Sequence, residues 1–159
     1  MKKIFSFGKI DFNNTGEKIN LVTIEVELKE RNGNPVFTAS GNIWNSRKSD
    51  IIMGGQCIDS IYTEFKNQIS DKQRFEKIMN LWQRNHLNDL NAGTPEQSAI
   101  IENAEKQGWK YDYSQACELL KKAGKYEVIH NGKLYKYGTA WIYRAIAPED
   151  LKEIKSLFD

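Results

Sequence analysis

Residues 86–97 read HLNDLNAGTPEQ, and three of their side chains could do chemistry. His86, Asn88 and Asp89 offer an imidazole, an amide and a carboxylate within four residues. Together with His130 they could supply the ligands and the general base of a metal-dependent hydrolase. A metal-dependent nuclease or hydrolase is therefore one hypothesis for this protein.

The same stretch is also typical of the corner between two helices. Thr94 suits a helix cap and Pro95 suits the first helical position. His86 falls near the end of the preceding helix, and Asn88 and Asp89 are common turn residues. The sequence has no HExxH motif, paired CxxC motif or carboxylate dyad. We therefore predict no resident metal, no other cofactor and no catalytic residues, and we predict that the protein is not an enzyme.

The two cysteines do not favour nucleophilic catalysis. Cys57 and Cys117 fall on predicted helices and are expected to be buried, reduced thiols. Burial in apolar surroundings raises the pKa of a thiol and makes it less reactive.

A set of aromatic residues on the predicted hairpin of residues 125–143 suggests a third possibility. The set shares one strand parity and has three cations nearby; it comprises Tyr135, Tyr137, Trp141 and Tyr143, with Lys133, Lys136 and Arg144. Stacked aromatics beside cations can bind single-stranded nucleic acid, as in a regulator of a mobile element. The alternative is that this face is core beneath the last helix. The net charge of only +2 lacks the basic excess of a nucleic-acid-coating protein, so direct nucleic-acid binding is not expected.

A polar segment after the third predicted strand is a candidate surface for a protein partner. Loops held by strands often carry recognition, and arginine and aromatic anchors with a polar rim are typical of interfaces. On the solvent-exposed face of the second predicted strand, two carboxylates could attract a basic partner and speed association. The partner-binding candidates are Trp44, Asn45, Arg47, Lys48, Asp50, Glu25 and Glu27.

The elements that position these residues are strands first and helices second. Strands are predicted within residues 1–12, 19–30 and 36–44, and the second alternates apolar and polar residues. Residues 45–56 are predicted to form a loop whose Ile51, Ile52 and Met53 pack inward. Helices follow, with Ser70 capping the second, and then a hairpin and a helix opened by Pro148. The predicted class is α+β: an antiparallel N-terminal sheet, a helical segment, a β-hairpin and a C-terminal helix.

Length and composition predict one domain over residues 1–159. Apolar residues make up 40% of the chain and charged residues 28%, which is ordinary for a globular protein. The first residues lack the unbroken apolar stretch of a signal peptide, and no run approaches the length of a membrane span. We therefore expect a cytoplasmic protein with no membrane partner.

Four stretches together resemble a family of small proteins carried by phages and other mobile elements of Gram-positive bacteria. They are GNIWNSRKSDIIMGGQC (41–57), LWQRNHLNDLNAGTPEQ (81–97), KYDYSQACELLKKAGKYEV (110–128) and KYGTAWIYRAIAPEDLKEI (136–154). Some relatives carry a CPxCG element before the tyrosine-glycine motif. This chain has IHNGKLYKYG there, so the resemblance implies no zinc site.

The whole chain is also similar to anti-CRISPR proteins that inhibit the type II RNA-guided nuclease of the host. That resemblance implies a stoichiometric binder of the effector nuclease, with the HNH nuclease domain as the expected target. Blocking the active site of that domain, or its docking movement, would stop DNA cleavage. The implied location is the cytoplasm of a bacterial host.

Overall fold

The computed structural model describes residues 1–11, 15–16, 20–31, 34–85, 95–107, 127–137 and 142–159. The chain divides into two compact units. The first contains Met1–Lys29, Phe37–Arg84 and Asp150–Asp159, and the second contains Glu30–Val36 and Asn85–Glu149. A single domain over residues 1–159 stays a prediction, because one domain can hold two compact units. In the described part of the chain, no helix is long and apolar enough to cross a membrane.

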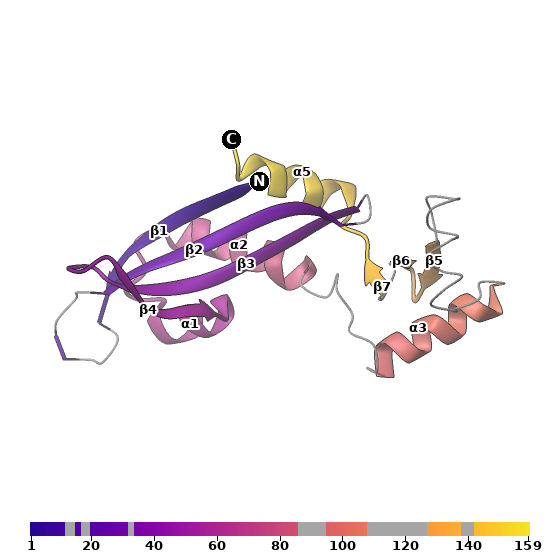
Figure 1. Cartoon of the computed structure of the whole chain (residues 1–159), viewed down its shortest axis with the longest axis horizontal. Helices are drawn as coiled ribbons and strands as arrows, with labels where there is room; N and C mark the ends of the chain where they lie inside the picture. Colours follow the sequence, from indigo (N-terminus) through magenta and orange to yellow (C-terminus); the bar gives the residue numbers. More distant parts are fainter. Residues whose placement is uncertain (12–14, 17–19, 32–33, 86–94, 108–126, 138–141) are drawn as a thin grey trace. The chain divides into compact units, whose positions relative to one another are not determined.

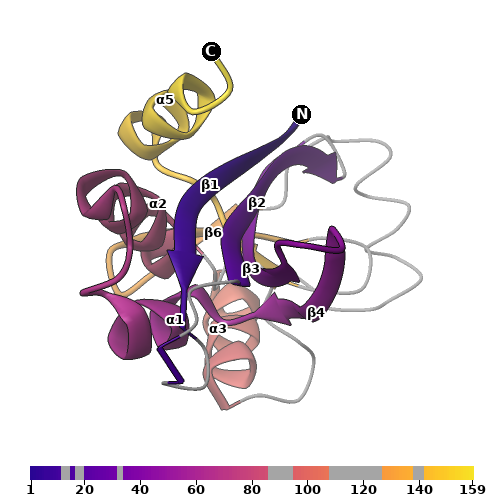
Figure 2. The same cartoon turned by 90° about the vertical axis from the view of Figure 1, so that its left-hand side faces the viewer.

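The first unit is built on an antiparallel sheet with the strand order β1-β2-β3-β4 (Figure 1). The strands are β1 (Lys2–Ile10), β2 (Asn20–Arg31), β3 (Asn34–Asn45) and β4 (Asp50–Gln56). The helices lie to one side of this sheet in Figure 2 and are α1 (Ile58–Phe65), α2 (Lys72–Asn85) and α5 (Pro148–Ser156). Strands and helices are thus segregated, and the predicted α+β class is confirmed.

The core of this unit lies between the sheet and its helices. Along β2, Val22, Ile24 and Val26 are fully buried, as the alternation of the sequence predicts. From β1, the ring of Phe7 meets the ring of Phe75 on α2 edge to face, with 4.9 Å between the centroids. Such pairs add to the stabilisation from burial alone. The covered face of the sheet is therefore the apolar one.

The predicted loop of residues 45–56 is wrong in part, because residues 50–56 form the strand β4. β4 pairs with β3 and lies at the edge of the sheet. Ile51 and Ile52 were expected to pack inward, but 52% and 46% of their surfaces are exposed. The physical reason is that both residues lie on an edge strand in which the register shifts. The extra residue breaks the alternation of side chains between the two faces of the sheet, so alternation no longer predicts which residues are buried.

The predicted cap of α2 is displaced by one residue. The carboxylate of Asp71, not the hydroxyl of Ser70, accepts a hydrogen bond from the backbone N–H of Arg74, at 3.2 Å. The backbone N–H of Ser70 instead donates to the carbonyl oxygen of Phe7 on β1, at 3.1 Å. Ser70 therefore ties the start of α2 to the sheet, and Asp71 caps the helix.

The second unit contains α3 (Pro95–Lys106) and a small antiparallel sheet of β5 (Glu127–His130), β6 (Lys133–Tyr137) and β7 (Ile142–Arg144). Pro95 takes the first helical position, as predicted. Asn131 and Gly132 connect β5 to β6 with φ angles of 51° and 73°, the two positive values that a tight hairpin turn of this type requires. The side chain of Asn103 on α3 donates to the carbonyl oxygen of Ile129, at 3.0 Å, so the helix is tied to β5.

Candidate functional site

The turn between β3 and β4 is shaped by Asn45. Its side-chain oxygen accepts hydrogen bonds from the backbone N–H groups of Arg47 (3.1 Å) and Lys48 (3.3 Å). Asn45 also pairs with Asp50 across the strands, and Ser49 has a φ of 58°. Asn45 therefore folds the turn through its side chain, while the side chains of Arg47 and Lys48 are exposed.

Trp44 lies near the end of β3, directly before Asn45. Its indole nitrogen donates a hydrogen bond to the hydroxyl of Thr23 on β2, at 2.8 Å. Thr23 shares its strand parity with Glu25 and Glu27, whose face of the second strand was expected to be exposed to solvent, yet Thr23 is only 5% exposed. The bond to the indole explains this burial, because the large ring of Trp44 lies against Thr23. The ring of Trp44 itself is half-buried and is held in place by this bond.

The structure brings five of the seven predicted partner-binding residues together, namely Trp44, Asn45, Arg47, Lys48 and Asp50. Glu25 and Glu27 lie elsewhere on β2. Because β2 and β3 run in opposite directions, positions after Thr23 on β2 lie progressively further from the turn that follows Trp44. With the usual rise per residue of a strand, Glu25 is about 7 Å and Glu27 about 13 Å from Thr23. Glu25 also forms an ion pair with Lys2, at 3.5 Å. The carboxylates therefore form a separate acidic patch, partly neutralised by a lysine.

Two residues that the sequence analysis missed adjoin the cations of the turn. Trp44 lies opposite Ile51 and Ile43 lies opposite Met53, so Ile52 is an extra residue in β4. Both isoleucines are about half exposed. A pair of β-branched residues directly after a polar turn is a usable signal for a strand. We call the set Trp44, Arg47, Lys48, Asp50, Ile51 and Ile52 the hairpin surface.

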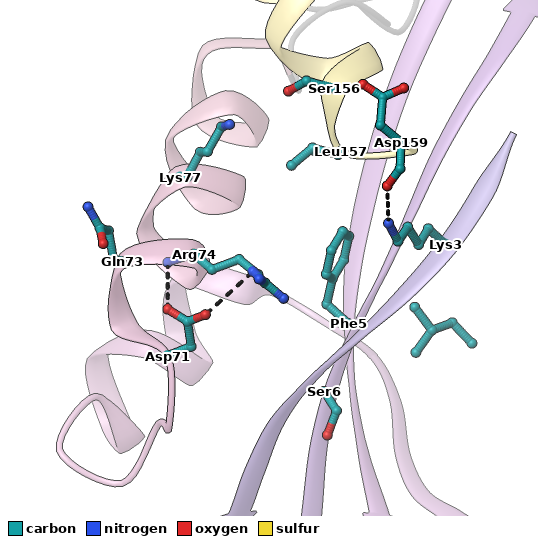
Figure 3. Close-up of a pocket in the computed structure, with 11 residues that line it drawn as sticks. Lys3, Phe5, Ser6, Asp71, Gln73, Arg74, Lys77, Ser156, Leu157 and Asp159 are labelled. Carbon is teal, nitrogen blue, oxygen red and sulfur yellow. Dashed lines mark hydrogen bonds and ion pairs between the residues drawn. The ribbon is translucent and has the colours of Figure 1, made fainter.

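A shallow hollow of about 880 Å³ lies between β1, α2 and α5 (Figure 3). Its cations are Lys3, Arg74 and Lys77. Arg74 forms an ion pair with Asp71, at 3.4 Å, and Lys3 donates to the backbone oxygen of Asp159, at 3.0 Å. Two of these three cations thus already bind groups of the chain itself. The lining residues come from three distant parts of the sequence, so spacing could not predict the hollow.

The structure gives no support to the metal hypothesis. His86, Asn88 and Asp89 lie outside the described residues. His130 lies at the end of β5, where its Nε2 is 3.3 Å from the side-chain nitrogen of Asn131. Within the ranges that the structure describes, no group of three or more His, Cys, Asp or Glu residues could hold a metal ion. A metal-dependent hydrolase remains a hypothesis about residues 86–89.

The predicted row of hairpin aromatics is interrupted. Tyr135 is only 4% exposed, and its hydroxyl lies 3.5 Å from a carboxylate oxygen of Glu96. Burial, and then the nearby charge of Glu96, raise the pKa of Tyr135. In the backbone register Tyr135 pairs with Arg144, and Tyr143 pairs with Lys136. Paired positions share a face, so the prediction that one face of the hairpin carries all these positions is wrong for position 143. Tyr135 is a core residue and is unavailable for stacking on a base; Trp141 lies outside the described residues.

The expectation for Cys57 is wrong in its burial. Cys57 is exposed and precedes the first residue of α1. Its thiol pKa is nevertheless raised, mainly by a hydrogen bond with Asp59 and further by partial burial and the negative charge of Asp59. A raised pKa keeps the thiol protonated near neutral pH and makes it a poor nucleophile. Cys117 lies outside the described residues.

No protein-family model, curated protein or solved structure matches this chain. The hairpin surface combines exposed cations, exposed large apolar side chains and an aromatic ring that a hydrogen bond holds.

Proposed function

We propose that this protein is a non-enzymatic inhibitor of the anti-CRISPR type. It binds a type II CRISPR effector nuclease stoichiometrically, with the HNH nuclease domain as the expected contact, and blocks DNA cleavage. The choice of target rests on the resemblance of the sequence to such inhibitors. The observation that carries the binding role is the hairpin surface, where Arg47 and Lys48 stand beside two isoleucines that are about half exposed.

The composition of the hairpin surface suits a protein partner. Arginine and aromatic side chains are enriched in interfaces, and the residues that contribute most binding energy are fully desolvated in the complex. Here Trp44 is already held by Thr23, so binding costs little of its rotational freedom. Burying Ile51 and Ile52 against a partner would remove apolar surface from water and so favour association.

The acidic patch of Glu25 and Glu27 has a separate role in this proposal. It lies on β2, away from the cations of the hairpin turn. Charged groups outside the centre of an interface mainly change the rate of association and its dependence on salt. A nuclease surface that binds DNA is basic, so these two carboxylates would attract it and orient the encounter.

The experiment is a titration of the purified protein into a cleavage reaction of a guide-loaded type II nuclease. Inhibition that saturates near one inhibitor per nuclease is the expected result. Inhibition at far lower ratios would mean turnover, and it would favour the hydrolase hypothesis of His86 and Asn88. Full cleavage with nucleases from several Gram-positive hosts, at a large excess of inhibitor, would reject the proposal.

A further inference from the structure

The two edges of the sheet differ in how well they are protected. Exposed edge strands can pair with other chains, and proteins usually prevent this with bulges, lysines or covering segments. β1 has all three. Its register shifts between Ser6 and Lys9, it contains Lys2, Lys3 and Lys9, and its Phe7 carbonyl is occupied by the backbone N–H of Ser70.

β4 also carries register shifts, opposite Gly41–Ile43 and Ile43–Trp44, but it differs from β1 in its charge. From Ile51 to Gln56 the strand contains no charged residue, and most of its residues are exposed. Arg47 and Lys48, the cations of the turn that precedes β4, lie together at one end of the strand. Glycines 54 and 55 leave room for another backbone to approach, and the N–H of Gly55 is fixed by the side-chain oxygen of Asn42, at 3.1 Å. This edge is ordered and apolar, and its cations lie at one end.

We propose that β4 binds the partner by accepting an extended segment of it as a fifth strand of the sheet. This inference rests on the proposed function, because it names the mode of contact with the nuclease. In strand addition the backbone hydrogen bonds give affinity, and alternate side chains give specificity. The occupant is a segment with apolar residues opposite Ile51 and Ile52 and a carboxylate at the end beside Arg47 and Lys48. That charge complementarity distinguishes it from an uncharged strand.

The test combines hydrogen exchange with matched variants. Exchange of backbone amides is followed by mass spectrometry for the inhibitor alone and for its stoichiometric mixture with the guide-loaded nuclease. Those amides of residues 51–56 that are not already bonded to β3 or, as that of Gly55 is, to Asn42 should exchange about tenfold more slowly in the mixture, because the added strand accepts hydrogen bonds from them. The amides of β1 should not change.

The variants place lysines at exposed isoleucines of two different strands. The double variant Ile51→Lys/Ile52→Lys should raise the inhibitor concentration for half-inhibition about tenfold or more, because it charges the apolar edge. The control is Ile129→Lys, which changes an isoleucine that is 62% exposed on β5, in the other sheet. It should stay within about twofold of the parent protein. Thermal melting followed by circular dichroism checks that both variants are folded.

Four results would overturn this inference. If the parent protein inhibits cleavage but the amides of residues 51–56 keep their exchange rates, the proposed function stands and strand addition at β4 falls. The same holds if Ile129→Lys weakens inhibition as much as the double variant does. If protection of β4 grows with the concentration of the free inhibitor, its occupant is a second copy of this chain. If the parent protein inhibits no nuclease tested, the proposed function falls, and this mode of contact falls with it.

Discussion

The indole nitrogen of Trp44 and the hydroxyl oxygen of Thr23 lie 2.8 Å apart and join the base of the β3–β4 hairpin to β2. Thr23 is 5% exposed, so its hydroxyl is almost removed from water. A buried polar group gains most of its stabilisation from being paired. This bond therefore fixes the orientation of Trp44 and anchors the hairpin surface to the sheet.

Thr23→Val should lower the free energy of unfolding by about 1 to 2 kcal/mol, because it keeps the shape of the side chain but removes the acceptor of the indole N–H. Urea unfolding measures the change. Thr38→Val is the control, since Thr38 is exposed on the neighbouring strand β3 and should change stability by less than about 0.5 kcal/mol. Equal effects of the two substitutions would show that the bond adds nothing.

Local patterns in the sequence are enough to predict the first three strands and the ends of several elements. The alternation along β2 fixes its buried face because successive side chains of a strand point to opposite sides. Asn131 and Gly132 identify their turn because few other residues accept two positive φ angles. Such features depend on neighbours in sequence, so the sequence shows them directly.

The apolar half of the candidate site could not be predicted in this way. Ile51 and Ile52 are exposed because β4 is an edge strand with an extra residue in its register. Position at an edge is a property of the whole sheet, and one extra residue reverses the sides assigned by alternation. The burial of Thr23 likewise depends on Trp44, which lies 21 positions away in sequence.

Gly41→Ala tests how closely α1 approaches β3. The pairing register of β3 and β4 shifts between Gly41 and Ile43, and the extra residue lies on β4. A Cβ atom at this position would lie 2.2 Å from the Cδ1 atom of Ile61, so the isoleucine must move. We expect a loss of about 1 to 3 kcal/mol in the free energy of unfolding. Because only the tip of Ile61 clashes, Gly41→Ala/Ile61→Val should be more stable than Gly41→Ala alone. An equal or lower stability of the double variant, measured by urea unfolding, would contradict this contact.

Arg84 on α2 and Asp150 on α5 form an ion pair with two hydrogen bonds, at 2.9 and 3.3 Å. Asp150 also lies in the first turn of α5, where a carboxylate interacts favourably with the helix dipole. A double-mutant cycle with Arg84→Gln and Asp150→Asn separates the two effects. Since Arg84 is 49% exposed, we expect a coupling energy of about 0.5 to 1 kcal/mol. A coupling near zero would mean that Asp150 acts only through its helix.

Tyr62 on α1 should make stability depend on alkaline pH. Its hydroxyl donates to a carboxylate oxygen of Glu76 on α2, and this hydrogen bond is the main cause of its raised pKa. A group whose pKa is higher in the folded protein stabilises it below the unfolded value of about 10, and this contribution is lost as pH rises through the folded pKa. The stability advantage of the parent protein over Tyr62→Phe should therefore shrink above about pH 10. In difference titrations of tyrosinate absorbance against Tyr62→Phe, Glu76→Gln should move ionisation of Tyr62 to lower pH. An unchanged titration would exclude Glu76 as the cause.

Arg47→Ala/Lys48→Ala should weaken inhibition of the nuclease about tenfold or more while leaving the melting temperature unchanged. Both side chains are exposed, and the turn is held by Asn45 through backbone groups that alanine retains. Stability should therefore survive, whereas cations that face a carboxylate of the partner contribute directly to binding. The control is Lys152→Ala/Lys155→Ala, which removes two exposed cations from α5. Cleavage assays and thermal melts distinguish the outcomes: if both pairs weaken inhibition equally, only net charge matters; if neither does, the turn is not part of the interface.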